Sequence, residues 1–352
     1  MTDIQHLSRP DGETLAFKRI EGAGPPVVWV GGFRSDMEGT KALALDAAAR
    51  ERGWNFIRYD HFAHGQSSGD WRQATIGRWR EDAIALINSL SGPVIPVGSS
   101  MGGWVSLLAT LTRPERIKGL VLINPAQDFT ERLMWPGLAD HERQAILREG
   151  ETLVVEEGLG EYVLTRRMFE EARDWLLLDG VIDIAAPVHI LQGRADDVVP
   201  WRHQIELVER LTGGDVRLDL IEGGDHRLST PTDLDRLVAA VEGIRLTWSS
   251  PEQRSETGEG DRRQAVEGAT PDTGLWPAPL HHASHGPLPR CAGEDRRVSP
   301  YPSAPHTDPC ADPGRSPRPR DTCPVHPDRS GAPAPPPPRR PGSRPDRRAD
   351  RR

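Results

Sequence analysis

VIPVGSSMGGW, residues 94–104, joins a short apolar run to a glycine-flanked serine and the start of a helix. Its first four residues are typical of a strand that is buried on both faces. Gly98, Ser100 and Gly102 then form the pattern G-x-S-x-G, which Ser99 does not fit. The glycines let the strand and the following helix approach closely, so that the serine hydroxyl is exposed on a sharp turn. The stretch predicts a nucleophile elbow at Ser100, although the same letters also occur in ordinary glycine-rich turns.

The chain on either side alternates between short apolar runs and amphipathic segments. Strands are expected near residues 13–20, 27–30, 55–59, 119–124, 188–193 and 216–221, and helices near 39–52, 76–90, 103–112, 201–211 and 233–244. This alternation predicts a mostly parallel sheet with helices on both faces. Residues 126–186 show no convincing buried strand, and we expect them to form a small helical cap inserted into the sheet domain.

Composition divides the 352 residues into two parts. Apolar runs stop near residue 250, and 22 of the 33 prolines and all three cysteines lie in residues 251–352. We therefore predict one α/β domain over residues 1–250, which is long enough for a sizeable core. The proline- and arginine-rich remainder cannot bury enough apolar surface to offset its ordering entropy, which predicts a disordered tail.

Two further interpretations of the tail stay open. Its proline run at 335–338 could bind a partner domain weakly as a polyproline II segment. Arginine without lysine, together with proline and glycine, is also what a GC-rich gene produces in the wrong reading frame. The irregular spacing of the tail's cysteines and histidines does not indicate a metal site, and we expect neither a metal nor an organic cofactor.

Charge and hydropathy exclude several function classes. The net charge is −8 for the whole chain, and residues 1–250 carry the acidic excess. A domain with a net negative charge binds nucleic acid poorly, so no nucleic-acid partner is expected. No stretch approaches 18 consecutive apolar residues, which predicts no membrane span. The first residues lack the features of a secretory signal or an arginine-rich presequence, and we expect a cytoplasmic protein.

Two later motifs complete a catalytic constellation. In a parallel sheet of this kind, the groups that activate a serine follow later strands, the acid first and then a histidine. RADDVVP and EGGDHRLS each follow one of the last two predicted strands. We therefore predict a triad in which His226 takes the proton of Ser100 and Asp196 orients the imidazole. Asp197 is the alternative acid, but it leads into the next helix, so we prefer Asp196.

An oxyanion hole requires two backbone donors that face the developing negative charge. We expect one to be the N–H of Met101, directly after the nucleophile. The other is expected to be the N–H of Phe33, in the glycine-rich loop after the strand at 27–30. His61 and His64 follow the next predicted strand, but loop histidines are more often structural, so we leave them out of the site.

The motifs together resemble a known family. Residues 1–250 resemble the α/β-hydrolase fold, and GGFRSDMEGTKALAL, GRWREDA, VGSSMGGW, DDVVPW and DHR resemble the abhydrolase domain-containing protein ten group. Those proteins are serine thioesterases that remove palmitoyl groups from protein cysteines and also cleave acyl glucuronides. The resemblance implies Ser100 as nucleophile, Asp196 as acid and His226 as base. It also implies a small-molecule or acylated-protein substrate, and a mitochondrial location by family analogy alone.

Other functions remain open on the sequence. A short-chain carboxylesterase or a lipase-like hydrolase would use the same triad. A non-catalytic receptor could retain the hydrolase fold without turnover.

Overall fold

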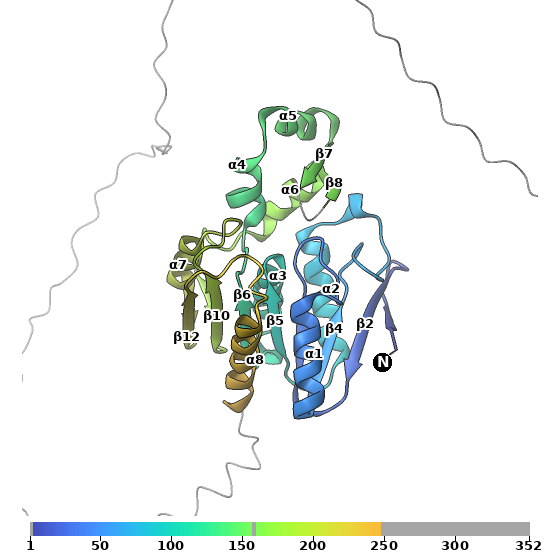
Figure 1. Cartoon of the computed structure of the whole chain (residues 1–352). Helices are drawn as coiled ribbons and strands as arrows, with labels where there is room; N and C mark the ends of the chain where they lie inside the picture. The colour runs from blue at the N-terminus through green and yellow to red at the C-terminus, as the bar shows by residue number, and fades with distance from the viewer. Residues whose placement is uncertain (1–2, 157–159, 248–352) are drawn as a thin grey trace, which may run out of the picture. The chain divides into compact units, whose positions relative to one another are not determined.

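The computed structural model describes residues 3–156 and 160–247, so the predicted tail at 251–352 lies outside the described residues (Figure 1). Its centre is an eight-stranded sheet in the order β1-β2-β4-β3-β5-β6-β10-β12. The strands are β1 (Gln5–Ser8), β2 (Thr14–Ile20), β3 (Ala23–Val30), β4 (Trp54–Tyr59), β5 (Ile95–Ser99), β6 (Leu120–Ile123), β10 (Val188–Gly193) and β12 (Val216–Ile221). β2 pairs antiparallel with β1 and β4, and the other neighbouring pairs are parallel. The predicted mostly parallel sheet is confirmed.

Helices cover both faces of the sheet (Figure 1). α1 (Thr40–Arg52) and α8 (Pro231–Leu246) pack on one face. α2 (Ile76–Ser89), α3 (Met101–Thr112) and α7 (Trp201–Arg210) pack on the other. Val27 of β3 packs in the core under α1 and α8, and its neighbour Val28 packs in the core under α2, α3 and α7. Because successive strand residues point to opposite faces, a strand buried on both sides must be apolar at every position.

Local sequence explains where several helices begin. Thr230 precedes α8, and its hydroxyl accepts the N–H of Asp233 while the Asp233 carboxylate accepts the N–H of Thr230. This capping box, with Pro231 in the first turn, satisfies backbone donors that have no partner within the helix. Thr75 caps α2 with a single bond, in which its hydroxyl accepts the N–H of Arg78. Among the described residues, none of the helices combines the length and apolar character that crossing a bilayer requires.

The cap between β6 and β10 is not wholly helical, which corrects the prediction. It contains a π-helical turn (Thr130–Met134), α4 (Trp135–Gly137), α5 (Asp140–Glu149), β7 (Glu151–Glu156), β8 (Gly160–Thr165), α6 (Arg166–Ala172), a 3-10 turn (Arg173–Trp175) and β9 (Ile182–Ile184). β7 and β8 form an antiparallel hairpin, and β9 pairs with β11 (Leu211–Gly213). Leu153 and Val155 are 58% and 71% exposed, whereas Tyr162 and Leu164 are buried. The hairpin thus buries one face only, and a search for strands buried on both faces misses it.

Asp128 holds the two ends of this cap together. Its buried carboxylate accepts the N–H groups of Leu177 at 2.9 Å and Leu178 at 2.8 Å. Burial raises the pKa of Asp128 to about 6, although both backbone bonds act in the opposite direction. A single side chain at the start of the insertion therefore ties down the segment that leads back to the sheet.

The backbone of α3 approaches the sheet too closely for side chains at two positions. A Cβ atom on Gly98 would overlap the carbonyl oxygen of Gly102, and one on Gly102 would overlap the carbonyl oxygen of Val30. These atoms belong to the backbone and cannot move aside independently. The glycines that the sequence singled out are therefore required by the contact of α3 with β3 and β5.

Replacing Gly102 with alanine should destabilise the fold by about 1–3 kcal/mol, because the added methyl group overpacks a backbone contact. Gly243→Ala is the matched control, since nothing lies within 4 Å of a Cβ at that exposed position in α8. Alanine has the higher helix propensity, so the control should be neutral or up to about 1 kcal/mol stabilising. Urea unfolding of both variants measures the difference, and equal effects would contradict the proposed role of the contact.

Candidate active site

Ser100 stands between β5 and α3 in a strained backbone conformation. Its φ is 53° and its ψ is −121°, a region that residues other than glycine rarely adopt. Its N–H donates to the carbonyl of Ile123 at 2.9 Å, and its own carbonyl accepts the N–H groups of Gly103 and Ala126. These bonds to α3 and to the end of β6 hold the strained turn in place. Its side chain stands at the carboxyl end of the sheet and remains partly exposed.

Asp196 and His226 meet Ser100 in one hydrogen-bonded chain. His226 Nδ1 lies 2.8 Å from Asp196 Oδ2, and His226 Nε2 lies 3.2 Å from Ser100 Oγ. The carboxylate can only accept, so Nδ1 carries the proton and Nε2 is left to accept one from the serine. The Asp196 side chain has no exposed surface, and that of His226 is 25% exposed. The arrangement can remove a proton from a serine hydroxyl and stabilise the imidazolium that forms.

The two aspartates weighed on the sequence differ in their contacts. Asp196 Oδ1 accepts the N–H groups of Val198 at 2.9 Å and Val199 at 2.7 Å, which orients its other oxygen toward the imidazole. Asp197 is exposed, and the structure does not bring it into the chain. Asp225, beside His226, accepts the N–H of Leu228 at 2.8 Å and shapes the loop that carries the histidine.

The backbone around Ser100 suits an oxyanion site. A Cβ atom on Gly32 would lie 3.4 Å from Ser100 Cβ, so the glycine loop before Phe33 packs directly against the serine. Met101 opens α3, and the first N–H groups of a helix have no acceptor within it. The glycine loop and the first turn of α3 therefore both place backbone close to the Ser100 hydroxyl.

The Phe33 ring packs among aromatic side chains from the sheet domain and the cap. Ring centroids lie 5.2 Å from Trp71, 5.6 Å from Tyr162 and 5.8 Å from Phe129. Tyr162 belongs to β8, so the cap hairpin contributes to this cluster. The cluster gives the surroundings of the glycine loop an apolar character.

Arg34 and Trp71 join the glycine loop to the cap hairpin. The Arg34 guanidinium lies over the rings of Trp71 at 5.3 Å and Tyr162 at 5.4 Å, and it donates to the carbonyl of Glu161. Trp71 Nε1 donates to the carbonyl of Val163 at 2.7 Å. These contacts hold the β7–β8 hairpin beside the glycine loop, which itself packs against Ser100. The position of the cap hairpin therefore affects the backbone next to the serine.

His61 and His64, left out on the sequence, brace the same loop. His61 Nε2 contacts the carbonyl of Gly31 at 3.2 Å. His64 Nδ1 donates to the carbonyl of Phe62 at 3.0 Å, and its Nε2 accepts the N–H of Arg34 at 3.1 Å. Burial lowers the pKa of His61 to about 3 and that of His64 to about 4. Both rings are therefore neutral and structural, and only their position after β4 hinted at a role near the site.

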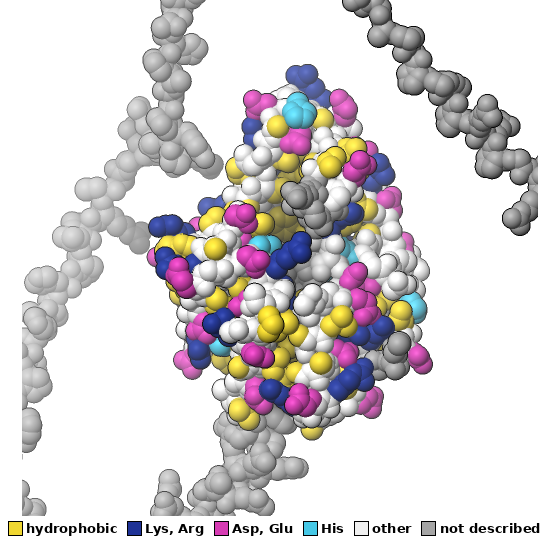
Figure 2. All heavy atoms as spheres, viewed as in Figure 1, with side chains coloured by type: hydrophobic (Ala, Val, Ile, Leu, Met, Phe, Trp, Pro, Cys, Tyr) yellow, Lys and Arg dark blue, Asp and Glu magenta, His cyan; other side chains and the backbone are white. Residues whose placement is uncertain are grey.

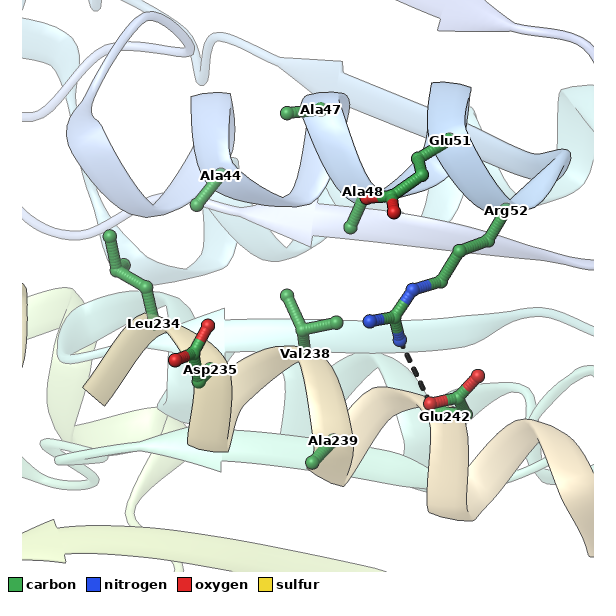
Figure 3. Close-up of a pocket in the computed structure, with 10 residues that line it drawn as sticks. All are labelled: Ala44, Ala47, Ala48, Glu51, Arg52, Leu234, Asp235, Val238, Ala239 and Glu242. Carbon is green, nitrogen blue, oxygen red and sulfur yellow. Dashed lines mark hydrogen bonds and ion pairs between the residues drawn. The ribbon is translucent and has the colours of Figure 1, made fainter. Parts of the chain in front are cut away.

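Two shallow depressions on the surface are not lined by Ser100, Asp196 or His226. One lies between α1 and α8, where alanines from α1 face α8 and Arg52 pairs with Glu242 at 2.8 Å (Figure 3). The other is lined by residues of the cap and by Arg72 and Gln73. Acidic and basic side chains are intermingled on the face shown in Figure 2. Within the described part of the chain, no group of His, Cys, Asp and Glu side chains could hold a metal ion.

The sheet order and the position of each loop define the class of protein. A mostly parallel sheet with a serine after β5, an acid after β10 and a histidine after β12 is an α/β-hydrolase. Residues 26–168 match the family model described as serine aminopeptidase, S33. The predicted α/β-hydrolase fold is confirmed.

Individual relatives show to which group of α/β-hydrolases the chain belongs. The chain is 34% identical over 248 residues to bovine mitochondrial palmitoyl-protein thioesterase ABHD10, covering 69% of this chain and 80% of that protein. A solved structure described as a hydrolase from Agrobacterium vitis S4 is 40% identical, with a TM-score of 0.66 over 70% of this chain and 98% of that one. The mouse α/β-hydrolase domain-containing protein 10 is 30% identical, with a TM-score of 0.65 over 70% of this chain and 100% of that one. The chain belongs to the ABHD10 family of α/β-hydrolases, which supports hydrolysis of an ester or thioester bond.

The comparisons correct the expected cytoplasmic location. The ABHD10 relatives from cattle, rat and human are each named as mitochondrial proteins. The expectation of a cytoplasmic protein rested on finding no recognisable signal among the first residues, and it was wrong. A targeting signal is an address that a receptor reads, and its features vary too much for such a reading to decide the location.

His64→Asn should destabilise the protein less at acidic pH than at neutral pH. Burial lowers the pKa of His64 from 6.5 to about 4, so the unfolded chain binds more protons than the folded chain between these values. The stability that the neutral imidazole contributes is therefore lost as the pH falls through this interval. Urea unfolding should show the wild-type advantage shrinking by about 1.4 kcal/mol per pH unit below about pH 6. His141→Asn, at an exposed position in the cap, is the control, and a pH-independent penalty at His64 would contradict the assignment.

Proposed function

We propose that this protein is a serine hydrolase that cleaves acyl thioesters or esters through a covalent acyl-enzyme. The observation that carries the proposal is the hydrogen-bonded chain from Asp196 through His226 to Ser100. Ser100 Oγ attacks the acyl carbonyl while His226 Nε2 takes its proton. The N–H groups of Met101 and Phe33 stabilise the oxyanion that forms.

The second half of the cycle uses the same groups in reverse. Collapse of the tetrahedral intermediate breaks the bond to the thiol or alcohol, and the imidazolium of His226 gives that leaving group its proton. Water then attacks the acyl-enzyme while His226 takes its proton, and His226 returns that proton to Ser100 Oγ as the bond to the serine breaks and the carboxylic acid leaves. Asp196 stays ionised throughout and stabilises the imidazolium.

We infer that the substrates are acyl proteins, with a palmitoyl thioester as the preferred bond and acyl glucuronides as further substrates. Relatives named palmitoyl-protein thioesterase support this choice. The aromatic cluster around Phe33 is consistent with this choice, because it makes the surroundings of the glycine loop apolar. Tyr162 and Phe129 are the cap's contribution to that cluster.

Ser100→Ala should abolish covalent labelling by a fluorophosphonate probe and lower kcat/KM by at least about 10³-fold. Ser99→Ala is the matched control, and it should retain labelling because Ser99 lies outside the hydrogen-bonded chain. Rates on a palmitoyl thioester, a short p-nitrophenyl ester and an acyl glucuronide should fall together in the Ser100 variant. In the wild type, faster turnover of the short ester would favour a general carboxylesterase, and absence of labelling would indicate a non-catalytic receptor.

Exchanging each aspartate of the acid loop for asparagine should separate their roles. Asp196→Asn removes the charge that fixes the imidazole tautomer and should lower kcat by about 10²–10⁴-fold. Asp197→Asn changes an exposed neighbour and should leave kcat within about twofold of wild type. Steady-state kinetics on one ester measure kcat for both variants. Similar losses of kcat in the two would contradict the role of Asp196 as the triad acid.

A further inference from the structure

Asn124, directly after β6, is a buried polar residue that the proposed chemistry does not use. Its side chain is fully buried, and its φ of 42° places it in the left-handed region that asparagine tolerates better than most residues. Its N–H donates to the carbonyl of Leu191 at 2.9 Å. A strained, buried amide at the carboxyl end of the sheet indicates a local requirement for its hydrogen bonds.

The Asn124 side chain links the loop of the acid with the loop of the histidine. Its Oδ1 accepts the N–H of Gly193 at 2.8 Å, at the end of β10 and three residues before Asp196. Its Nδ2 donates to the carbonyl of Asp225 at 3.0 Å and to that of His226 at 2.8 Å. An amide is the side chain that supplies two donors on one atom and an acceptor on the other.

The backbone of Ser100 is hydrogen-bonded to the residues on either side of Asn124. Ser100 donates its N–H to the carbonyl of Ile123, the residue before Asn124, and accepts the N–H of Ala126 two residues after it. The short segment around Asn124 therefore contacts the elbow, the acid loop and the histidine loop. Few other positions in a parallel sheet could reach all three, because β6 lies between β5 and β10.

We propose that Asn124 is a positioning residue that sets the distance between the imidazole of His226 and its two partners. The inference rests on the proposed serine-hydrolase function and adds a residue to it. Asn124 acts on the backbone of the two loops and touches no reacting atom. Its loss would leave the triad residues present but allow the histidine loop to shift against the acid loop, which weakens proton transfer from Ser100.

The histidine loop is also held from its other side, so removing Asn124 should not unfold it. Lys41 of α1 donates from Nζ to the carbonyl of Arg227, and burial lowers the pKa of Lys41 to about 8. Asp225 accepts the N–H of Leu228 within the loop. Lys41 contacts the histidine loop from α1, and the charged and titratable side chains of the two loops themselves are Arg194, Asp196, Asp197, Glu222, Asp225, His226 and Arg227.

The test is the second-order rate at which a fluorophosphonate probe labels Ser100 in the full chain, together with kcat and KM for an ester substrate. Asn124→Ala should slow labelling and lower kcat by about tenfold or more while KM stays within about twofold, since substrate contacts are unchanged. Gln127→Met is the matched control, because Gln127 is a buried amide whose Nε2 donates to the carbonyl of His203 in α7 and bonds neither loop of the triad. It should lose stability without a comparable loss of labelling rate.

Asn124→Asp preserves the shape of the side chain and provides a pH-dependent readout, measured over the pH range in which circular dichroism shows the variant to be folded. An ionised carboxylate cannot donate to the carbonyls of Asp225 and His226 and is repelled by both, whereas a protonated carboxyl restores one of these bonds. The labelling rate relative to wild type should therefore fall as the pH rises. This variant also keeps the proposal testable if Asn124→Ala does not fold.

The outcomes separate the inference from the function on which it rests. A wild-type protein that is labelled, with folded Asn124 variants labelled at the wild-type rate and with a wild-type pH profile, would overturn the positioning role alone. A wild-type protein that is not labelled would overturn the serine-hydrolase function, and the positioning role with it. Slow labelling with the stated pH dependence supports both.

Discussion

The site depends on the direct contact between the backbone of α3 and strands β3 and β5. Gly98 and Gly102 allow this contact, because a Cβ at either position would overlap a carbonyl oxygen. The contact forces the chain to turn within one residue, and Ser100 takes the strained conformation with a φ of 53°. Backbone bonds to Ile123, Gly103 and Ala126 hold that strain. A protein can maintain such a conformation only where its surroundings determine it more strongly than the residue's own preference.

Buried polar side chains then hold the loops around this turn. His61 and His64 brace the glycine loop, Asp128 ties the ends of the cap, and Asn124 joins the acid and histidine loops. In each case the partner is a backbone N–H or carbonyl. Loops at the edge of a sheet carry backbone groups that no ladder satisfies, and a buried polar side chain both satisfies them and defines the loop conformation. The loops around Ser100 are therefore held in place by these polar contacts as well as by the apolar core.

The cap contacts the same framework through its hairpin. Arg34 and Trp71 contact the β7–β8 hairpin beside the glycine loop, and Tyr162 of β8 packs against Phe33. A shift of the hairpin would therefore move side chains next to the proposed oxyanion donors. The position of the cap hairpin and the conformation of the glycine loop therefore depend on the same contacts.

The sequence by itself determined the α/β sheet, its helices and the order of the serine, acid and histidine motifs. Those features depend on local signals: apolar runs such as residues 94–97, the glycines at 98 and 102, and caps such as Thr230. The tertiary structure alone decided the one-sided β7–β8 hairpin, the neutral state of His61 and His64, and the contacts of Asn124. The spatial meeting of Ser100, Asp196 and His226 could be anticipated, because the carboxyl ends of parallel strands share one edge of a sheet. The hydrogen bonds of Asn124 could not, because they join residues up to 102 positions apart and no periodic pattern encodes such a contact.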